Sequence, residues 1–226
     1  MTAKDMFSHR VSILTGHYGT GKTEVSVNLA LALAAEGEQV MLADLDIVNP
    51  YFRSRERRPL LEKAGVRVIS SSQACSDADV PALPAELLTI LENREIRGIL
   101  DIGGDPVGAR VLARFLPKIQ AEDYQLLYVL NANRPEVRTP EAAVRYLRGL
   151  EQTTGLTCTG LVNNTHLCGE TTPREIRKGA ALAAAVRDAT GIPVICHMAE
   201  QRFTDSLSDL PETVFPITIQ MKKPWE

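Results

Sequence analysis

Short apolar runs alternate along the chain with longer segments in which apolar residues recur every three or four positions. The runs are rich in β-branched residues, as buried strands are, and the longer segments have the period of helices. Alternation of this kind predicts an α/β fold, a doubly wound and mostly parallel sheet of about seven or eight strands. We predict strands at residues 10–15, 39–43, 66–70, 98–101, 124–130, 159–162, 192–196 and 214–219.

Helices are predicted between the strands, several of them marked by capping signals. Gly37 fits the left-handed position after the first helix, and Thr172 with Glu175 has the capping-box pattern. Thr139 and Pro140 predict an N-cap and a first helical residue. The predicted helices cover residues 25–36, 84–94, 107–119, a segment opened by residues 139–140, and 173–190. Residues 197–200 are predicted to be a loop.

Composition indicates one well-buried globular domain, residues 1–226. The chain has 226 residues, 44% of them hydrophobic, and no low-complexity stretch divides it. A net charge of −3 argues against a general nucleic-acid binder. Because no apolar run has the length of a signal peptide or a membrane span, we expect a cytoplasmic location and no transmembrane segment.

The four cysteines are widely separated and form no C-x-x-C pair. Neither a zinc knuckle nor a disulfide framework is therefore indicated. Isolated cysteines of this kind are more often buried in a core than functional. We expect core thiols at positions Cys75, Cys158, Cys168 and Cys196.

One stretch carries the clearest chemistry, the full G-x-x-x-x-G-K-[ST] pattern of a phosphate-binding P-loop at residues 16–23. Its glycines allow successive backbone N–H groups to converge on one anion at the start of a helix. We expect Lys22 to reach the β- and γ-phosphates of a nucleotide and Thr23 to coordinate magnesium. The residues predicted to bind nucleotide here are Gly16, His17, Tyr18, Gly19, Thr20, Gly21, Lys22 and Thr23.

Acidic residues follow two of the predicted strands. Asp44 and Asp46 come after residues 39–43, and Asp101 ends the strand at 98–101. Since ligands gather beyond the carboxyl ends of parallel strands, these acids are expected near the phosphates. Asp46 is the candidate for positioning the attacking water or a metal-bound water. Asp101 is expected to hold magnesium, and Gly104 to sense the γ-phosphate.

Two asparagines end the strand at 159–162. A side-chain amide has both the donor and the acceptor needed to read a purine edge, although asparagines also shape turns. Purine contact is favoured for Asn164, whereas for Asn163 the two roles remain equally open. The chain has no N-K-x-D guanine motif, so ATP is the expected nucleotide.

A basic segment follows the first acidic pair. Its arginines could stabilise charge on a transferring phosphoryl group, dock an acidic partner or second subunit, or form a solvated face. The sequence leaves these alternatives open for Arg53, Arg55, Arg57 and Arg58.

These motifs, in this order, make residues 10–200 resemble the MinD/ParA/Mrp group of P-loop ATPases, most strongly before residue 110. The segment from Asp44 to Pro50 is similar to the Mrp-like Asp-x-Asp-Ile pattern, and a subgroup of bacterial ATP-binding proteins resembles the P-loop and residues 44–53 more closely still. The resemblance implies that Lys22 binds phosphate and that Thr23 is a magnesium ligand. It also implies that Asp46 is the switch I acid, Asp101 the Walker B acid and Asn164 the asparagine that contacts adenine.

Two departures from that group matter. His17 stands where many members have a signature lysine that reaches across a dimer, so this trans-acting mechanism is not expected unless a protonated His17 or a nearby arginine substitutes. The paired cysteines that hold a cluster in Mrp-like proteins are also missing. The sequence therefore does not support iron–sulfur carriage.

The favoured function is magnesium-dependent ATP hydrolysis, slow without a partner, that couples switch-loop changes to a protein client or to homodimerisation. One alternative is an ATP-dependent small-molecule ligase or kinase that resembles dethiobiotin synthetase or a CobB-type domain. Dethiobiotin synthetases, however, have one more residue in the P-loop. The other alternative is a nucleotide-bound switch that does not hydrolyse ATP.

Overall fold

The structure is a computed structural model that describes residues 1–46, 57–70, 86–104, 112–113 and 115–221. At its centre is one sheet of eight strands in the order β3-β2-β4-β1-β5-β6-β7-β8, with every neighbouring pair parallel. The strands are β1 (Val11–Thr15), β2 (Gln39–Leu45), β3 (Arg67–Ser70), β4 (Ile96–Ile102), β5 (Tyr124–Leu130), β6 (Gly160–Asn163), β7 (Val194–Glu200) and β8 (Val214–Ile217).

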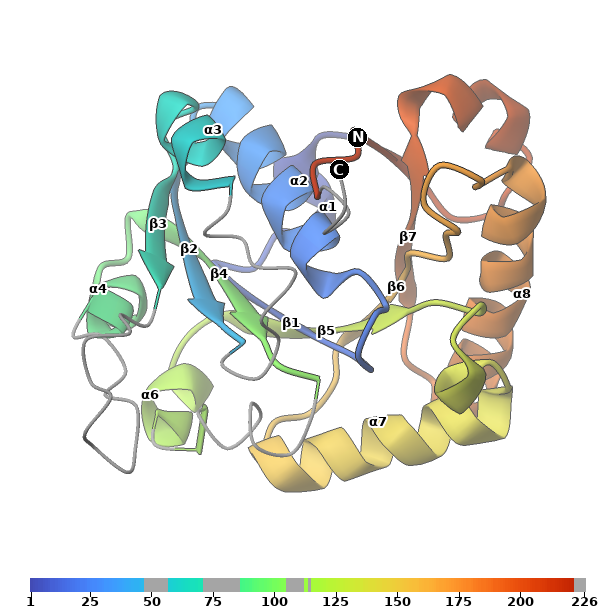
Figure 1. The fold of residues 1–226 in the computed structure, drawn as a ribbon. Coiled ribbons are helices and arrows are strands. Elements are labelled where there is room, and N and C mark those ends of the chain that lie inside the picture. Colours follow the sequence, from blue (N-terminus) through green and yellow to red (C-terminus); the bar gives the residue numbers. More distant parts are fainter. Residues whose placement is uncertain (47–56, 71–85, 105–111, 114, 222–226) are drawn as a thin grey trace, which may run out of the picture.

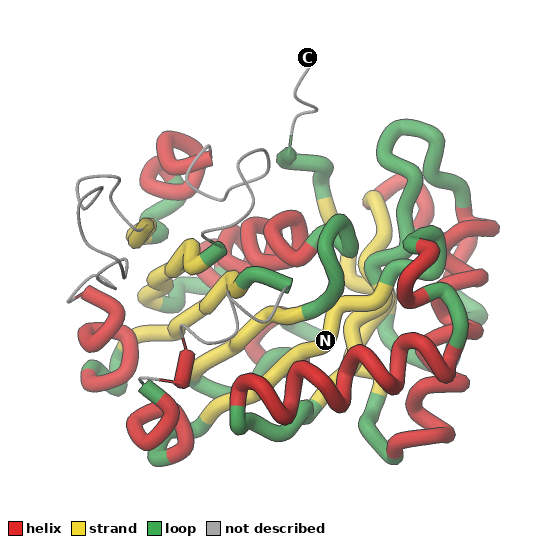
Figure 2. Tube along the Cα trace, turned by 60° about the horizontal axis from the view of Figure 1, so that its bottom comes forward, coloured by secondary structure: helices red, strands yellow, loops and turns green. Residues whose placement is uncertain are grey.

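Helices cover both faces of this sheet (Figures 1 and 2). One face packs against α1 and α2 through a cluster that includes Phe7 and Leu29, and the other against α4 and α7 through Leu91 and Leu147. The doubly wound α/β fold is thus confirmed. The helices are α1 (Ala3–Met6), α2 (Lys22–Ala35), α3 (Arg58–Lys63), α4 (Glu86–Glu92), α6 (Leu116–Gln120), α7 (Pro140–Thr154) and α8 (Pro173–Thr190), with 3-10 turns at Pro135–Val137, Gln201–Phe203 and Asp205–Leu207.

The strand order reverses around β1, which lies between β4 and β5. The chain passes from β1 toward β2 and β3 on one side of the sheet, and continues through β5 to β8 on the other. In open parallel sheets such a reversal leaves a crevice beyond the carboxyl ends of the strands, where ligands bind. The P-loop follows β1 directly, so it lies at this crevice.

The helix that follows the P-loop is held at its carboxyl end by the start of the chain. Glu36, directly after α2, accepts hydrogen bonds from the backbone amides of Ala3 (2.6 Å) and Lys4 (2.9 Å). These amides belong to the first turn of α1, where a carboxylate is favoured. The amino-terminal segment is thereby attached to α2.

The first turn of α2 holds the other end of the described chain. The carboxylate of Glu24, which is buried, accepts hydrogen bonds from the amides of Gln220 (2.7 Å) and Met221 (3.0 Å). One turn later Asn28 accepts a hydrogen bond from the amide of Thr218 (3.0 Å). Both ends of α2 are therefore fixed by backbone amides from distant parts of the chain.

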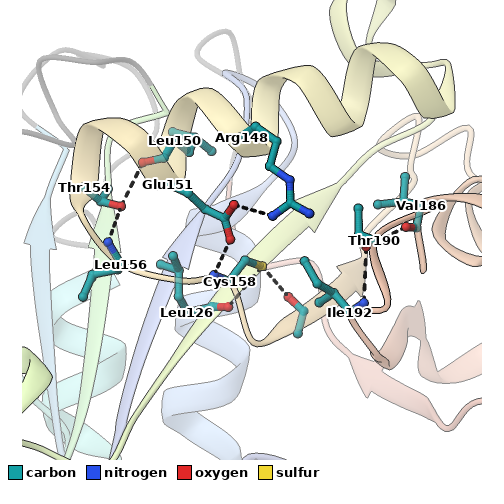
Figure 3. Close-up of polar contacts among 11 residues, drawn as sticks. Leu126, Arg148, Leu150, Glu151, Thr154, Leu156, Cys158, Val186, Thr190 and Ile192 are labelled. Atoms are coloured by element: carbon teal, nitrogen blue, oxygen red, sulfur yellow. Dashed lines mark hydrogen bonds and ion pairs between the residues drawn. The ribbon is translucent and has the colours of Figure 1, made fainter. Parts of the chain in front are cut away.

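Helices α7 and α8 end in the same way (Figure 3). A threonine in the last turn, Thr154 or Thr190, accepts a hydrogen bond from the amide two residues later, that of Leu156 (3.2 Å) or Ile192 (3.3 Å). The glycine between them is left-handed in each case, with φ of 70° and 76°. This arrangement stops each helix and turns the chain toward β6 or β7.

Two predicted elements differ from the structure. Strand β7 continues to Glu200, so the prediction of a loop at residues 197–200 was wrong, because Met198 and Ala199 continue the buried pattern and His197 finds polar partners inside. The helix predicted at 107–119 lies partly outside the described residues. In its described part a turn at Phe115 separates residues 112–113 from α6.

Two further features concern the short first helix and the length of the helices in the described part of the chain. Helix α1 was not predicted, because its capping box pairs Thr2 with Asp5 in a helix of only four residues. Among the helices described, none is both long and apolar enough to cross a bilayer.

Candidate functional site

The P-loop joins β1 to α2 and leaves the first turn of the helix without a side-chain cap. Gly21 is the N-cap residue of α2 and is left-handed, with φ of 84°. The N–H groups at a helix start carry partial positive charge, and they bind anions when no side chain caps them. The local structure therefore leaves the N–H groups that the predicted motif assigns to phosphate without a side-chain cap.

Side chains from the next two strand ends hold the P-loop carbonyls. Arg134, after β5, donates from Nε to the carbonyl oxygen of Gly19 at 2.6 Å. Asn164, after β6, donates from Nδ2 to the carbonyl oxygens of Thr20 at 2.9 Å and Gly21 at 3.2 Å. Because the C=O and N–H of a trans peptide point in opposite directions, holding these carbonyls on one side directs the following amides to the other.

The loop after β4 lies directly against the P-loop. A β-carbon on Gly104 would lie 2.1 Å from the carbonyl oxygen of Gly16 and 3.1 Å from Nζ of Lys22. Only glycine fits there. Lys22 is buried, and its Nζ lies 3.5 Å from the carbonyl oxygen of His17. The structure thus brings Gly104 to the predicted phosphate-binding lysine.

Buried carboxylates meet at the same edge of the sheet. Asp44 and Asp101 are register partners on β2 and β4, and the amide of Asp46 lies 3.3 Å from Oδ1 of Asp44. Asp101 is 1% exposed, and no described residue makes a well-formed hydrogen bond to either of its carboxylate oxygens. The three predicted acids are therefore neighbours.

Their proximity changes the ionisation of Asp101. Burial, and next the negative charge of Asp44, raise its pKa to about 7, although Lys22 and Thr23 act in the opposite direction. A carboxylate in this position would be stabilised by an additional cation. The site therefore has several buried carboxylates beside Lys22, the predicted phosphate-binding lysine.

The donor set fits magnesium. Mg²⁺ prefers oxygen ligands and usually keeps several waters together with one or two carboxylates and phosphate oxygens. The carboxylate oxygens of Asp101 and the hydroxyl of Thr23 are ligands of that kind. No group of three or more His, Cys, Asp or Glu residues in the described chain has the arrangement of an all-protein metal site.

The two asparagines after β6 have different roles. Asn163 is fully buried and bonds to the carbonyl oxygen of Ile176 (3.0 Å), to Nδ1 of His197 (3.1 Å) and to the amide of Thr165 (3.1 Å). Its side chain is thus used entirely within the protein. Asn164 contacts the P-loop instead, and its contact with a purine stays a prediction.

His166 lies at the P-loop and was not predicted. Its Nδ1 accepts a hydrogen bond from the amide of Cys168 (3.3 Å), so Nε2 carries the proton. Nε2 is buried, has no partner among the described residues, and would lie 3.1 Å from a β-carbon on Gly21. Burial, and next the charge of Arg134, lower its pKa to about 4, so the ring is neutral.

His17 faces α7. Its Nδ1 lies 3.0 Å from the carbonyl oxygen of Tyr18 and 3.9 Å from the carboxylate of Glu136. Its ring meets that of Tyr146 edge to face, with the centroids 5.1 Å apart. His17, at the position of the signature lysine, thus contacts residues of the same chain. The side chain of Tyr18 is exposed.

The basic segment is described only in part. Arg58 pairs with Glu62 one turn later on α3 (3.3 Å). Burial raises the pKa of Glu24, and the positive charge of Arg57 is among the weaker influences that oppose this rise. These two arginines therefore interact with the protein itself. Arg53 and Arg55 lie outside the described residues, as do residues 47–50 of the predicted switch I segment.

Comparison with known proteins finds a family model that matches the amino-terminal part of the chain. Residues 6–55 match the model of the ParA family described as NUBPL iron-transfer P-loop NTPase. The chain is 36% identical over 95 residues to the cytosolic Fe-S cluster assembly factor cfd1 of Emericella nidulans, a match that covers 42% of this chain and 26% of that protein. It is 32% identical over 131 residues to the Nubp2 homolog of Drosophila virilis, covering 55% and 46%.

A shorter match is closer in sequence. Forty residues are 50% identical to the iron-sulfur cluster carrier protein of Escherichia coli K12, covering 18% of this chain and 11% of that protein. Each of these three matches covers less than half of the curated relative.

Solved structures share the fold over most of the chain. The cell division protein FtsY of Thermotoga maritima superposes with a TM-score of 0.54 and 25% identity, covering 81% of this chain and 59% of that chain. Chloroplast FtsY of Physcomitrella patens gives a TM-score of 0.56 with 19% identity, covering 81% and 56%. The parallel sheet and the P-loop at its switch point, together with these likenesses, show a P-loop NTPase fold whose residues 6–55 are similar to the ParA family.

Proposed function

We propose that the protein binds ATP with magnesium, hydrolyses it, and couples the change in phosphate state to a protein partner or to a second copy of the chain. One observation carries the proposal. The uncapped start of α2, the buried Lys22 and the buried carboxylate of Asp101 converge at the carboxyl ends of β1 and β4. These groups have the charges that a magnesium–triphosphate complex requires.

Each residue would have a separate role in this proposal. Lys22 and the P-loop amides bind the phosphates and stabilise the negative charge that develops on the γ-phosphate. Thr23 and Asp101 would hold magnesium, and the bound ion would supply further positive charge at the phosphates. Asp46 positions the attacking water and accepts its proton.

Asn164 supports adenine as the preferred base. Its Nδ2 donates to the P-loop, and no described residue donates to its Oδ1. An amide oxygen can accept a hydrogen bond from the exocyclic amino group of adenine but not from the O6 of guanine. We expect ATP to bind more tightly than GTP in a competition experiment.

The proposal is tested by steady-state phosphate release from Mg-ATP. We expect turnover in the wild type and none above background in Lys22→Ala and Asp46→Asn. Matched controls are Lys63→Ala and Asp188→Asn, which change exposed residues far from the P-loop in sequence and should leave turnover intact. Binding of ATP without turnover above the two site variants would refute autonomous hydrolysis.

The relatives named for iron–sulfur assembly raise the question of a cluster. Cys158 and Cys196 belong to the hydrophobic clusters on opposite faces of the sheet. The thiol of Cys158 donates to the carbonyls of Leu126 and Gly160 (Figure 3), and burial raises its pKa to about 12. These two thiols cannot share one cluster. Cys168 is exposed, so the expectation of a core thiol was wrong at that position, and Cys75 lies outside the described residues.

We therefore propose that the chain shares the nucleotide site of those relatives and not a cluster ligand set of its own. Anaerobic reconstitution with iron and sulfide should yield no bound cluster, measured by iron content and visible absorption. A stoichiometric cluster that survives gel filtration would contradict this. Since two relatives are named as cytosolic, we also propose a cytoplasmic location.

A further inference from the structure

We infer that Arg134 is a positioning residue of the phosphate site, which supplies a permanent positive charge in cis and fixes the P-loop through the carbonyl of Gly19. The inference rests on the proposed nucleotide binding. Arg134 follows β5 and reaches the P-loop across 115 positions of sequence, with a distance of 2.6 Å from Nε to the carbonyl oxygen of Gly19.

The contact is built into the shape of the P-loop. Gly19 is left-handed, with φ of 74°, and a β-carbon there would lie 2.6 Å from Cζ of Arg134 and 2.8 Å from its Nε. Any other residue at position 19 would therefore displace the guanidinium. The glycine thus allows both the turn of the loop and the close approach of the arginine.

The charge of Arg134 is not neutralised by a neighbouring acid. No carboxylate of the described residues lies within ion-pair distance of its guanidinium, although Glu136 is only two positions away. A guanidinium has five N–H donors and stays protonated at any pH of interest. With one donor used on Gly19, a positive charge remains beside the loop that binds the phosphates.

The positive charge of Arg134 also affects His166. Arg134 contributes to the lowered pKa of His166, after burial, so its positive charge acts across the outer side of the P-loop. The neutral His166 adds no positive charge of its own. His17 is also turned away, toward Tyr146 and Glu136. Arg134 is therefore the cation that the described structure adds to Lys22 at this loop.

The bond to Gly19 also orders the loop. The peptide that Arg134 holds by its carbonyl continues into the amide of Thr20, which closes a turn onto the carbonyl oxygen of His17 (3.2 Å). The hydroxyl of Thr20 bonds to the same oxygen (2.9 Å). Loss of Arg134 would leave this turn less constrained and the phosphate site less positive.

The test is calorimetric binding of Mg-ATP, Mg-ADP and adenosine to Arg134→Met and Arg134→Lys. The matched control is Arg138→Met, an exposed arginine of the same segment. We expect Arg134→Met to weaken ATP binding about tenfold, which corresponds to about 1.4 kcal/mol. ADP should be affected less and adenosine hardly at all, because the effect depends on phosphate charge.

Recovery of ATP affinity, by lysine at position 134 or by added guanidinium, distinguishes a positioning role of Arg134 from a general structural role. Arg134→Lys should recover part of the affinity, and guanidinium chloride at a concentration far below that which unfolds the protein should restore part of the ATP affinity of Arg134→Ala. Thermal unfolding of the nucleotide-free variants shows whether they fold. If Arg134→Met is unstable, Arg134→Lys and the rescue experiment decide the question.

Different variants test nucleotide binding and the role of Arg134, so the two proposals can fail separately. If the wild type binds no nucleotide, or Lys22→Ala binds as well as the wild type, nucleotide binding at the P-loop is refuted. If Lys22→Ala loses binding while Arg134→Met stays within twofold of Arg138→Met, the role of Arg134 is overturned. Equal weakening for ATP and adenosine, without guanidinium rescue, would overturn it as well.

Discussion

The side-chain amide of Asn164 donates a 2.9 Å hydrogen bond to the carbonyl oxygen of Thr20, a residue 144 positions earlier in the chain. The next residue of the P-loop, Gly21, accepts from the same nitrogen. The end of β6 therefore holds the shape of a loop that follows β1. Nucleotide affinity should depend on this contact as well as on the residues of the motif.

Replacement of Asn164 by Ala should weaken nucleotide binding, because the P-loop loses the side chain that holds two of its carbonyls. The two lost hydrogen bonds should also lower the free energy of unfolding, by about 1 kcal/mol each. Asn163→Ala is the contrasting variant, since it leaves buried partners unsatisfied and should lower the free energy of unfolding by about 1–3 kcal/mol. Urea unfolding and ATP titration of both variants measure the difference. Equal effects of the two changes on affinity would contradict the assignment.

Gly19→Ala should be far more harmful to nucleotide binding than Gly37→Ala. Both glycines are left-handed, and an alanine in that conformation costs roughly 1–2 kcal/mol. A β-carbon on Gly37 meets nothing within 4 Å, whereas one on Gly19 collides with Arg134. Gly37→Ala should therefore lower the melting temperature and leave ATP affinity unchanged. A Gly19→Ala protein with wild-type affinity would show that the P-loop does not need the observed conformation.

Asp101→Asn should stabilise the nucleotide-free protein while abolishing turnover. The pKa of Asp101 is raised from 3.8 to about 7, so the folded protein holds a proton between these values that the unfolded chain has released. The free energy of unfolding therefore falls as pH rises through this window, and Asn removes the effect. At about 1.4 kcal/mol per pKa unit, the upper limit is about 4 kcal/mol above pH 7.

The control for this prediction is the pH dependence itself. The difference in unfolding free energy between Asp101→Asn and the wild type should be small near pH 4 and grow toward pH 7, measured by urea unfolding without nucleotide or metal. A difference that stays constant over this range would mean that the carboxylate is not the cause.

Glu24→Gln should loosen the carboxyl-terminal segment. The carboxylate accepts amides on both oxygens, from Gln220 and Met221, whereas glutamine presents an NH₂ group in place of one oxygen. One amide then loses its acceptor, at a cost of about 1–3 kcal/mol. Hydrogen exchange of residues 218–221 should accelerate. Glu36→Gln is the matched control and should accelerate exchange at Ala3 and Lys4 instead.

Much of the fold follows from local sequence. Parallel strands buried on both faces read as continuous apolar runs, and this pattern predicted the sheet and the edge strand β8, where Pro216 is tolerated. The end of β7 was missed because His197 is polar. Its burial depends on Asn163 and on Glu212 (3.1 Å), which no local pattern reveals.

The candidate site was predictable where one segment contains the chemistry. The P-loop and the strand-ending Asp101 are of this kind. Arg134 and His166 were missed because they lie in turns after β5 and β6, and their distance from the P-loop depends on which strands are neighbours of β1. Glu24 would be assigned to a helix surface by sequence, but it is buried by the backbone of residues 220–221.

The attachment of α2 at both of its ends has a consequence for spectroscopic experiments. Four backbone amides, two from each end of the described chain, bind Glu36 and Glu24. A slide or rotation of this helix on nucleotide exchange would break them together. We therefore expect α2 to keep its position relative to these two segments, and in a distance measurement between two spin labels the one attached to α2 should stay in place relative to them. Any change in distance could then be assigned to the other label.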